Sequence, residues 1–141
     1  MNDLRGTTAS AADLTTVSAF WKGAAKGTSI SDDLVGVQRL HARDPHALLL
    51  ARRGEELVGT VVAGFDGRRC HPYRLAVHSG HRRQGIGTAL PAAAEERFAA
   101  LGGRGADAMV LDGNEGARGA WGAAGYHPED IWTRWVKPLT D

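Results

Sequence analysis

Cysteine is nearly absent from this sequence of 141 residues, and Cys70 is its one example. A single cysteine cannot form an intramolecular disulfide, and it excludes a metal site built from several thiolates. No apolar run approaches the roughly 20 residues that a membrane-spanning helix needs. No secretory signal peptide is recognisable either. We therefore expect a protein of the reducing cytoplasm that does not span a membrane.

An excess of charge of either sign is also missing. Lys and Arg together number 17 and Asp and Glu 16, which gives a formal net charge of +1. The chain as a whole is therefore not attracted to nucleic acid or to anionic lipid, and we expect neither as a partner. Apolar residues make up 43% and charged residues 23%, as in ordinary globular proteins. With no internal repeat and no linker, we expect one domain over residues 1–141.

Hydrophobic spacing predicts two helices, then antiparallel strands, then a strand–helix–strand unit followed by a helix and a strand. Ser10, with Asp13 three residues later, suits the cap of the first helix, and Ser31 or Asp32 suits the cap of the second. The remaining elements are expected as strands at 3–9, 47–51, 57–65, 70–77 and 108–111, helices at 85–101 and 114–123, and a strand or hairpin at 126–136. This order predicts a mixed α/β sheet with one parallel crossover.

A loop rich in arginine and glycine joins the strand at 70–77 to the helix at 85–101. The first turn of a helix has unpaired N–H groups and partial positive charge. Gly85 and Gly87 lack the Cβ atom that would keep a large anion from those amides. Arg82 and Arg83 add positive charge, and the Thr88 hydroxyl adds a donor. A plain flexible turn is the alternative, but the combination with a buried strand and an amphipathic helix favours a pyrophosphate site.

Two other nucleotide-binding loops are excluded by their patterns. A P-loop closes with Gly-Lys-Ser or Gly-Lys-Thr, which this loop lacks. A dinucleotide-binding turn follows the first strand of a parallel sheet, whereas this glycine pair follows a predicted hairpin. Nucleic-acid binding through Arg82-Arg83 is disfavoured because no aromatic residues alternate with the basic ones.

The run from Arg82 to Gly87, R-R-Q-G-I-G, resembles the acetyl-CoA signature R/Q-x-x-G-x-G/A of the GNAT superfamily of N-acetyltransferases. Leu75-Ala76-Val77 is similar to the family's central strand. Asn114-x-x-Ala117 followed by Gly125-Tyr126 resembles a second family motif. The resemblance extends from about residue 47 to the end of the chain. It implies a GNAT-type fold, with a mixed, mostly antiparallel twisted sheet, flanking helices and splayed central strands.

The resemblance also implies a function, which is transfer of an acetyl group from acetyl-CoA directly to a primary amine of an unidentified acceptor. It requires no metal, and a homodimer is compatible with it. Backbone groups of Ala76 and Val77 should hold the pantetheine arm, and the Val77 amide or its neighbour should polarise the acetyl carbonyl. Asn114 should contact the cofactor near the pantetheine. The pyrophosphate should bind the amides of Arg82, Arg83, Gln84, Gly85, Ile86, Gly87 and Thr88.

Two positions depart from the family pattern. Pro91 lies inside the predicted helix, where it removes a backbone hydrogen bond and favours a kink or an irregular first turn. Trp121 occupies the position of a tyrosine that protonates the departing CoA thiolate in many relatives, and an indole N–H is no acid near neutral pH. Trp121 is therefore expected to line the site. A CoA-binding module without turnover remains the rival hypothesis.

The base that accepts the amine proton is left open among Asp66, His71, Tyr73 and His78. Asp66 precedes a glycine and can equally serve as a turn former. Tyr73 is expected on the same face of its strand as Leu75 and Val77, where it could also pack in the core. Two further tryptophans are expected in the core or in the walls of the cleft, namely Trp132 and Trp135.

Overall fold

The computed structural model describes residues 4–24, 31–82 and 84–140. Its elements follow in the order β1 (Leu4–Thr8), the 3₁₀ helix η1 (Ala11–Asp13), α1 (Leu14–Ala24), α2 (Leu34–Arg43), β2 (Leu48–Arg53), β3 (Glu56–Phe65), β4 (Cys70–Val77), the 3₁₀ helix η2 (Ser79–His81), α3 (Ile86–Ala100) and α4 (Glu115–Ala123). No helix in the described part of the chain is both long and apolar enough to cross a membrane.

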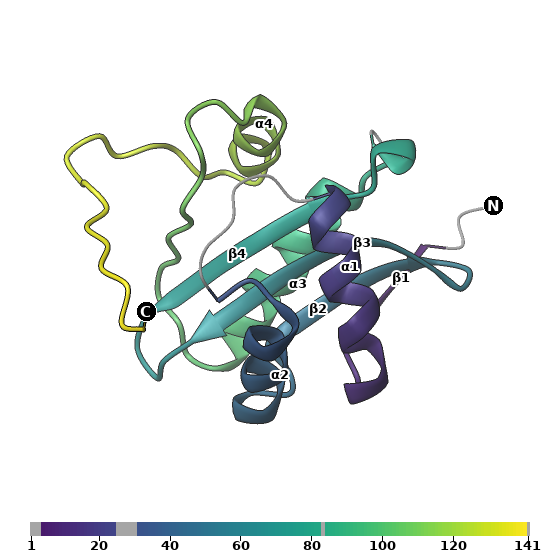
Figure 1. The fold of residues 1–141 in the computed structure, drawn as a ribbon. Helices are drawn as coiled ribbons and strands as arrows, with labels where there is room; N and C mark the ends of the chain where they lie inside the picture. Colours follow the sequence, from purple (N-terminus) through teal and green to yellow (C-terminus); the bar gives the residue numbers. More distant parts are fainter. Residues whose placement is uncertain (1–3, 25–30, 83, 141) are drawn as a thin grey trace.

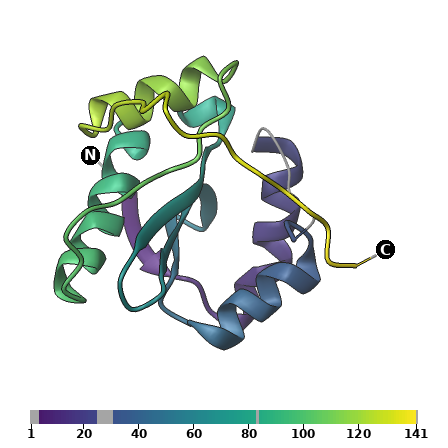
Figure 2. The ribbon, with the colours of Figure 1, turned by 90° about the vertical axis from the view of Figure 1, so that its left-hand side faces the viewer.

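The four strands form one antiparallel sheet in the order β1-β2-β3-β4 (Figure 1). Helix α3 covers one face of this sheet, and α1 and α2 cover the other (Figure 2). Each face has its own apolar cluster, with Val17, Trp21 and Val62 on the α1/α2 side. Ile86 and Leu90 belong to the cluster on the α3 side. Because β3 contributes to both clusters, it is the buried centre of the fold.

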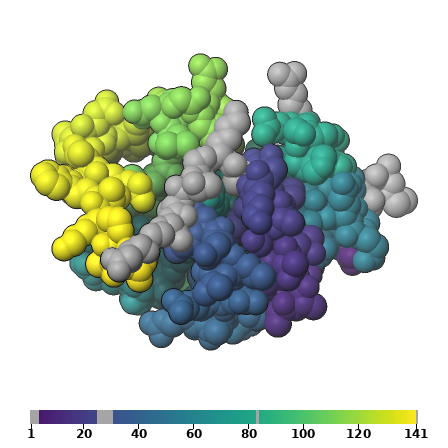
Figure 3. Space-filling view, viewed as in Figure 1, coloured from purple at the N-terminus to yellow at the C-terminus, as the bar shows by residue number. Residues whose placement is uncertain are grey.

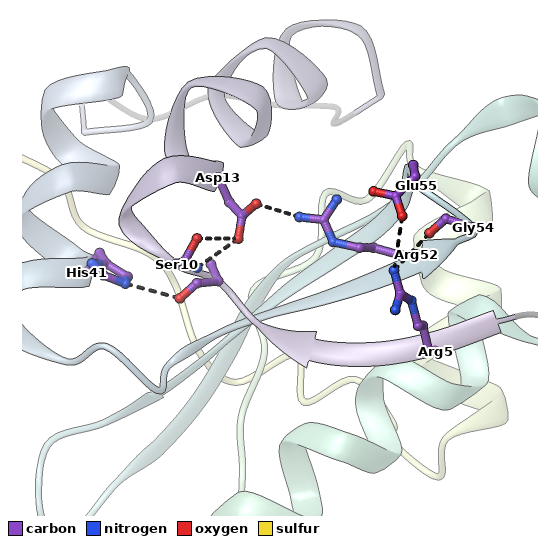
Figure 4. A network of polar contacts seen from close by, with 8 residues as sticks. Arg5, Ser10, Asp13, His41, Arg52, Gly54 and Glu55 are labelled. Atoms are coloured by element: carbon purple, nitrogen blue, oxygen red, sulfur yellow. Dashed lines mark hydrogen bonds and ion pairs between the residues drawn. The ribbon is translucent and has the colours of Figure 1, made fainter.

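The start of the first helical segment is fixed by the pair that the sequence predicts. The Ser10 N–H and hydroxyl both donate to Asp13 Oδ2, at 2.8 and 3.0 Å (Figure 4). The other Asp13 oxygen accepts from Arg52 of β2 at 2.6 Å, which ties the helix start to the sheet. His41 of α2 contacts the Ala9 carbonyl at 3.1 Å in the same region. These contacts anchor α1 and α2 to the strands that they cover.

The cap of α2 is Asp33, whose side chain accepts from the Gly36 N–H at 2.8 Å, so the assignment to Ser31 or Asp32 was wrong by one or two residues. Helix α3 runs from Ile86 to Ala100 through Pro91, whose side chain is fully buried. Apolar packing of Pro91 compensates for the hydrogen bond that its ring removes.

A β-bulge interrupts the pairing of β3 with β4. Val62 pairs with Tyr73 and Thr60 with Ala76, so two residues of β4 lie opposite Val61 alone. Arg74, at the bulge, has φ 53 and is the one non-glycine residue of the described chain with positive φ. The extra residue reverses the alternation of side chains along β4.

The bulge corrects the prediction that Tyr73 shares a face with Leu75 and Val77. Tyr73 pairs with Val62, which belongs to the cluster under α1 and α2. Leu75 and Val77 pack instead on the cluster beside α3. No local sequence pattern predicts the bulge, because an arginine with a left-handed backbone has no sequence signature.

The strand predicted at 108–111 is absent from the described structure, and so is the parallel crossover as a continuous ladder. One isolated parallel bridge joins Ala106 to Cys70, and the Asp107 N–H donates to the Cys70 carbonyl at 3.0 Å. Two residues further along this edge of β4 lies Pro72, which has no N–H to continue the ladder. The segment therefore diverges from β4 on its way to α4 (Figure 1).

The final strand predicted at 126–136 is also absent, because the preceding segment offers no strand edge on which it could pair. Trp132 and Trp135 are 74% and 92% exposed, so their assignment to the core or to cleft walls was wrong. In Figure 3 the residues after α4, drawn in yellow, lie on the outer side of the molecule next to α4.

Candidate active site

A cavity of about 970 Å³ opens where the chain diverges from β4. Its walls come from the outer edge of β4, the start of α3, the segment 107–111 and α4. The volume is at the upper end of the range for small-molecule and cofactor sites. Most of the residues predicted for the site line it, namely Tyr73, Ala76, Val77, Arg82, Gly85, Gly87, Thr88, Asn114 and Trp121.

The edge of β4 presents backbone groups to this cavity. The His78 N–H donates to the Val58 carbonyl at 2.8 Å, so His78 points toward β3. Successive residues of a strand alternate in direction, and the N–H and C=O of Val77 therefore point away from β3 and into the cavity. Ala76 points toward β3, where it pairs with Thr60. Of the two residues predicted to hold a pantetheine arm, only Val77 has a backbone oriented for it.

The start of α3 forms the second wall. Gly85 precedes the helix with φ 83, a left-handed conformation that favours glycine. The N–H groups of Thr88 and Ala89 both donate to the Gly85 carbonyl, at 3.3 and 2.9 Å. The amides before them precede the first hydrogen bonds of the helix, at its positive end. At Gly87 an added Cβ would meet only the Cβ of Ala120, at 3.7 Å, so there is room above this turn.

The side chains of the loop differ in their positions. Arg82 lines the cavity, and Arg83 lies outside the described residues. Gln84 is exposed and its amide oxygen lies 3.4 Å from His81 Nδ1. Ile86 is buried in the core against Gly59. Gln84 and Ile86 do not line the cavity, so any contribution that they make to an anion site comes from the backbone.

Helix α4 supplies the third wall. Asn114 caps it by accepting from the Ala117 N–H at 3.1 Å, which gives the N-x-x-A spacing a structural reason. Trp121 is 5% exposed and meets Tyr126 edge to face, with ring centroids 4.9 Å apart. Burial, followed by the charge of Glu95, raises the pKa of Tyr126 to about 12. Trp121 is thus a rigid apolar part of the cavity wall, as expected from the sequence.

Asp66 is not brought to the cavity. It lies in the exposed turn between β3 and β4, and its Oδ1 accepts from the N–H groups of Arg69 and Arg68 at 2.6 and 2.8 Å. The same two hydrogen bonds, with the Arg69 bond first, lower the pKa of Asp66. A carboxylate stabilised in this way is a poor proton acceptor, so the geometry favours the turn-forming role over the catalytic one.

The end of the cavity near the bulge carries polar side chains from several elements. His71 Nδ1 lies 3.1 Å from Asp107 Oδ1, and both residues line the cavity. Tyr73 lines it from the opposite face of β4, where burial and then the charge of Asp32 raise its pKa. The sequence offered His71 and Tyr73 as candidates but not Asp107 or Asp32, because nothing local marks a residue that reaches a site through a loop.

Among the described residues, no group of three or more His, Cys, Asp or Glu side chains is arranged to hold a metal ion. The groups that could hold a ligand are therefore backbone N–H groups, arginine and polar side chains. An extended ligand with an anionic group at one end fits this arrangement, since the anion can lie at the start of α3 and the rest can follow the edge of β4.

Comparison with known proteins agrees with this geometry. The family model described as acetyltransferase (GNAT) family matches residues 16–126. An acetyltransferase of Pectobacterium atrosepticum is 31% identical over 111 residues, which is 79% of each chain. An acetyltransferase of Photorhabdus laumondii is 39% identical over 71 residues, half of each chain.

Solved structures share the fold at low sequence identity. Ard1 from Thermoplasma volcanium superposes with a TM-score of 0.78 at 18% identity, over 87% of this chain and 82% of that one. AAC(6')-Iy, solved in complex with the bisubstrate analogue CoA-S-monomethyl-acetylneamine, gives 0.77 at 15% identity over 96% of this chain and 99% of that one. The protein yncA of Salmonella typhimurium, solved with its cofactor acetyl-CoA, gives a TM-score of 0.72 at 15% identity over 89% of this chain and 80% of that one.

Proposed function

The chain belongs to the acetyltransferase (GNAT) family and is an acetyl-CoA-dependent acyltransferase, and we propose that it transfers the acetyl group directly to a primary amine. The observation that carries this proposal is one cavity that joins the outer edge of β4 to the first turn of α3. We further propose that residues 1–141 act as one domain, because the cavity draws on both halves of the chain.

In this proposal the pyrophosphate of acetyl-CoA binds the first-turn amides of α3, with Arg82 and the Thr88 hydroxyl beside it. The pantetheine arm follows β4 and pairs with the N–H and C=O of Val77, as an added strand would. Asn114 lies on the opposite wall, where its amide nitrogen can donate to the same arm. The Leu75 N–H, two residues before Val77, faces the same way and is the donor for the acetyl oxygen.

The chemistry requires a neutral amine, because an ammonium has no lone pair to attack the thioester. We assign His71 as the base. Its Nδ1 faces Asp107, so Nδ1–H can donate to the carboxylate and leave Nε2 to accept the amine proton. The amine nitrogen then bonds to the acetyl carbon, the carbonyl oxygen becomes an oxyanion, and collapse breaks the C–S bond with CoA leaving as thiolate. The second proton that the nitrogen loses on becoming an amide passes to water.

No side-chain acid is assigned to the thiolate. A thiol with an ordinary pKa of about 8.5 leaves tolerably well without one. Trp121 is in the place where many relatives have an acidic tyrosine, and its burial suits it to excluding water from the thioester.

The test is binding followed by turnover. CoA and acetyl-CoA should both raise the melting temperature, and saturation at about a hundred times Kd should add about 2.7 kcal/mol to the unfolding free energy. Gly87→Glu should abolish this shift, because the cavity has room for the side chain but its charge repels the pyrophosphate. Gly87→Gln is the matched control, of the same size and without charge. An unmoved melting temperature in millimolar CoA would refute the proposal.

Turnover separates the enzyme from the rival hypothesis. Release of free CoA thiol should be followed with a panel of amines that includes peptide N-termini, polyamines and aminoglycosides. Thiol release that depends on one class of amine supports transfer and identifies the acceptor class. Binding of CoA with no amine-dependent release across the panel would favour a CoA-binding module without turnover.

A further inference from the structure

We infer that a buried network of Trp21, Thr60, Arg74 and Asp32 holds the β4 bulge so that the Leu75 N–H points at the acetyl oxygen. The four are positioning residues, because they act through the backbone of β4. The inference rests on the proposed function, since it concerns the amide that polarises the carbonyl in that reaction.

The bulge is a conformation that needs support. Arg74 adopts φ 53, a left-handed backbone conformation that is uncommon for residues other than glycine and that needs support from its surroundings. Strain of this kind is commonly found where a backbone group must be aimed at a ligand. The bulge lies in the wall of the cavity, and both Arg74 and Leu75 line it.

The backbone of Arg74 is held from the sheet. The Thr60 hydroxyl donates to the Arg74 carbonyl at 3.0 Å, and the Trp21 indole N–H donates to the Thr60 hydroxyl oxygen at 2.9 Å. Thr60 is fully buried and Trp21 is 5% exposed, so water does not compete for these groups. The position of the Arg74 carbonyl is thereby fixed from α1 through β3.

Fixing that carbonyl fixes the next amide. The Arg74 C=O and the Leu75 N–H belong to one planar trans peptide, so they point in opposite directions. The carbonyl accepts from the Thr60 hydroxyl, which also meets the Trp21 indole of α1, so the Leu75 N–H points away from that hydroxyl. Alternation along β4 from His78, which points toward β3, also directs the Leu75 N–H away from β3, to the side on which the cavity lies.

The side chain of Arg74 is held from the helices. It makes an ion pair with Asp32, just before α2, and the two side chains are 9% and 17% exposed. Its guanidinium also lies over the Trp21 ring, 5.5 Å from the centroid. Trp21 therefore contacts the Thr60 hydroxyl through its indole N–H and the Arg74 guanidinium through its ring. Together the contacts hold Arg74 at its carbonyl and at its side chain.

The first experiment removes the hydroxyl of Thr60 and keeps its shape. Thr60→Val should lower kcat at least about tenfold, the direction expected when an oxyanion donor is lost, while the Kd of CoA stays within about twofold. Thr60→Ser keeps the hydroxyl and should retain kcat. If Thr60→Val does not fold, Trp21→Phe replaces it, since phenylalanine keeps an aromatic ring near the Arg74 guanidinium and lacks the N–H donor. A fall in stability alone would leave kcat of the folded fraction unchanged.

Infrared spectroscopy of bound ¹³C-acetyl-CoA reports the same amide without turnover. In the wild type the carbonyl stretch should move to lower frequency than in solution, and Thr60→Val should return it toward the solution value. A shift that Thr60→Val keeps in full would overturn the network and leave the proposed function intact. A wild type with no shift and no acetyl transfer would overturn the proposed function.

Two substitutions at the bulge provide the decisive comparison. Arg74→Ala and Arg74→Gly both remove the guanidinium, but only glycine adopts positive φ without strain. If the network serves to hold the bulge, Arg74→Gly should retain several times more kcat than Arg74→Ala. Equal losses in the two variants would show that Arg74 acts through its charge, and would refute the positioning role.

Discussion

His71 Nδ1 and the Asp107 carboxylate meet at 3.1 Å, where the segment after α3 leaves β4. The neighbouring backbone is fixed by the hydrogen bond from the Asp107 N–H to the Cys70 carbonyl at 3.0 Å. Asp107 therefore fixes the end of the cavity through its backbone N–H and the orientation of the His71 imidazole through its carboxylate. This pairing is the structural reason to favour His71 over the other candidates for the base.

His71→Gln should lower kcat about a hundredfold, the usual contribution of a general base, with the Kd of acetyl-CoA unchanged. Asp107→Asn should cause a smaller loss, because it disturbs the tautomer and orientation of His71 and leaves the imidazole in place. Steady-state kinetics with the best amine of the panel and calorimetric titration of CoA measure the two quantities. His46→Gln, at an exposed position away from the cavity, is the control. Full activity in His71→Gln would show that the amine loses its proton to water or to another group.

Trp121 is expected to act as a wall. Trp121→Phe should preserve most of kcat, because a phenyl ring still fills much of the volume beside Tyr126. Trp121→Tyr should not raise kcat substantially, since the thiolate leaves without an acid. Thiol release at saturating substrate measures both variants. Activity that appears only in Trp121→Tyr would mean that the natural chain binds CoA without turning it over.

Tyr73 is the phenol to compare with Trp121. It lines the cavity, and burial, with the charge of Asp32, raises its pKa above the ordinary value of 10.0. It stays protonated at neutral pH, as an acid must, but it lies on the face of β4 under α1 and α2. Tyr73→Phe should therefore leave the alkaline side of the pH–rate profile in place. Loss of that limb with unchanged CoA binding would assign the acid's role to Tyr73.

Asp66 should behave as a turn residue. Asp66→Asn keeps an acceptor for the N–H groups of Arg68 and Arg69 and should leave kcat and the melting temperature close to wild type. Asp66→Ala removes the acceptor and should lower the melting temperature with kcat of the folded protein unchanged. Thermal melts and thiol-release rates on the same samples test both statements. A large loss of kcat in Asp66→Asn would restore the catalytic hypothesis.

Sequence reasoning succeeded where local patterns decide the structure. The hairpin of β3 and β4, the start of α3 at Ile86 and the cap of α4 at Asn114 each follow from turn residues, glycine or a side-chain acceptor within a few positions. The cofactor loop was recognisable for the same reason, because the chemistry of anion binding requires glycine and basic residues next to one another.

The sequence did not predict features that depend on distant contacts. The bulge at Arg74 is held by the Thr60 hydroxyl, 14 residues away, and by the ring of Trp21, 53 residues away. No local sequence pattern indicates either contact. The strand predicted at 108–111 has apolar residues but lacks a partner, because Pro72 interrupts the edge of β4. Pro72 is visible in the sequence, but its effect on the segment 108–111 follows only once that segment is considered as the pairing partner of β4.

The carboxylate of Asp13 joins the start of α1 to the sheet, and its contribution to stability should depend on pH. Asp13 accepts from the Ser10 N–H at 2.8 Å and from Arg52 at 2.6 Å (Figure 4). The Ser10 N–H, more than the Arg52 charge, lowers the pKa of Asp13 below its ordinary value of 3.8. A carboxyl group whose pKa is lowered by folding stabilises the protein above its unfolded pKa, and this stability is lost as the pH falls through the folded pKa.

Asp13→Asn should thus lower the unfolding free energy by about 1 kcal/mol at neutral pH. The difference from wild type should shrink below about pH 4 as the wild-type carboxylate is protonated. Urea unfolding at several pH values measures it, with Glu55→Gln as the control, since Glu55 meets Arg5 at 3.8 Å in full exposure. A difference that stays constant from neutral to acid pH would show that Asp13 stabilises α1 by its shape and not by its charge.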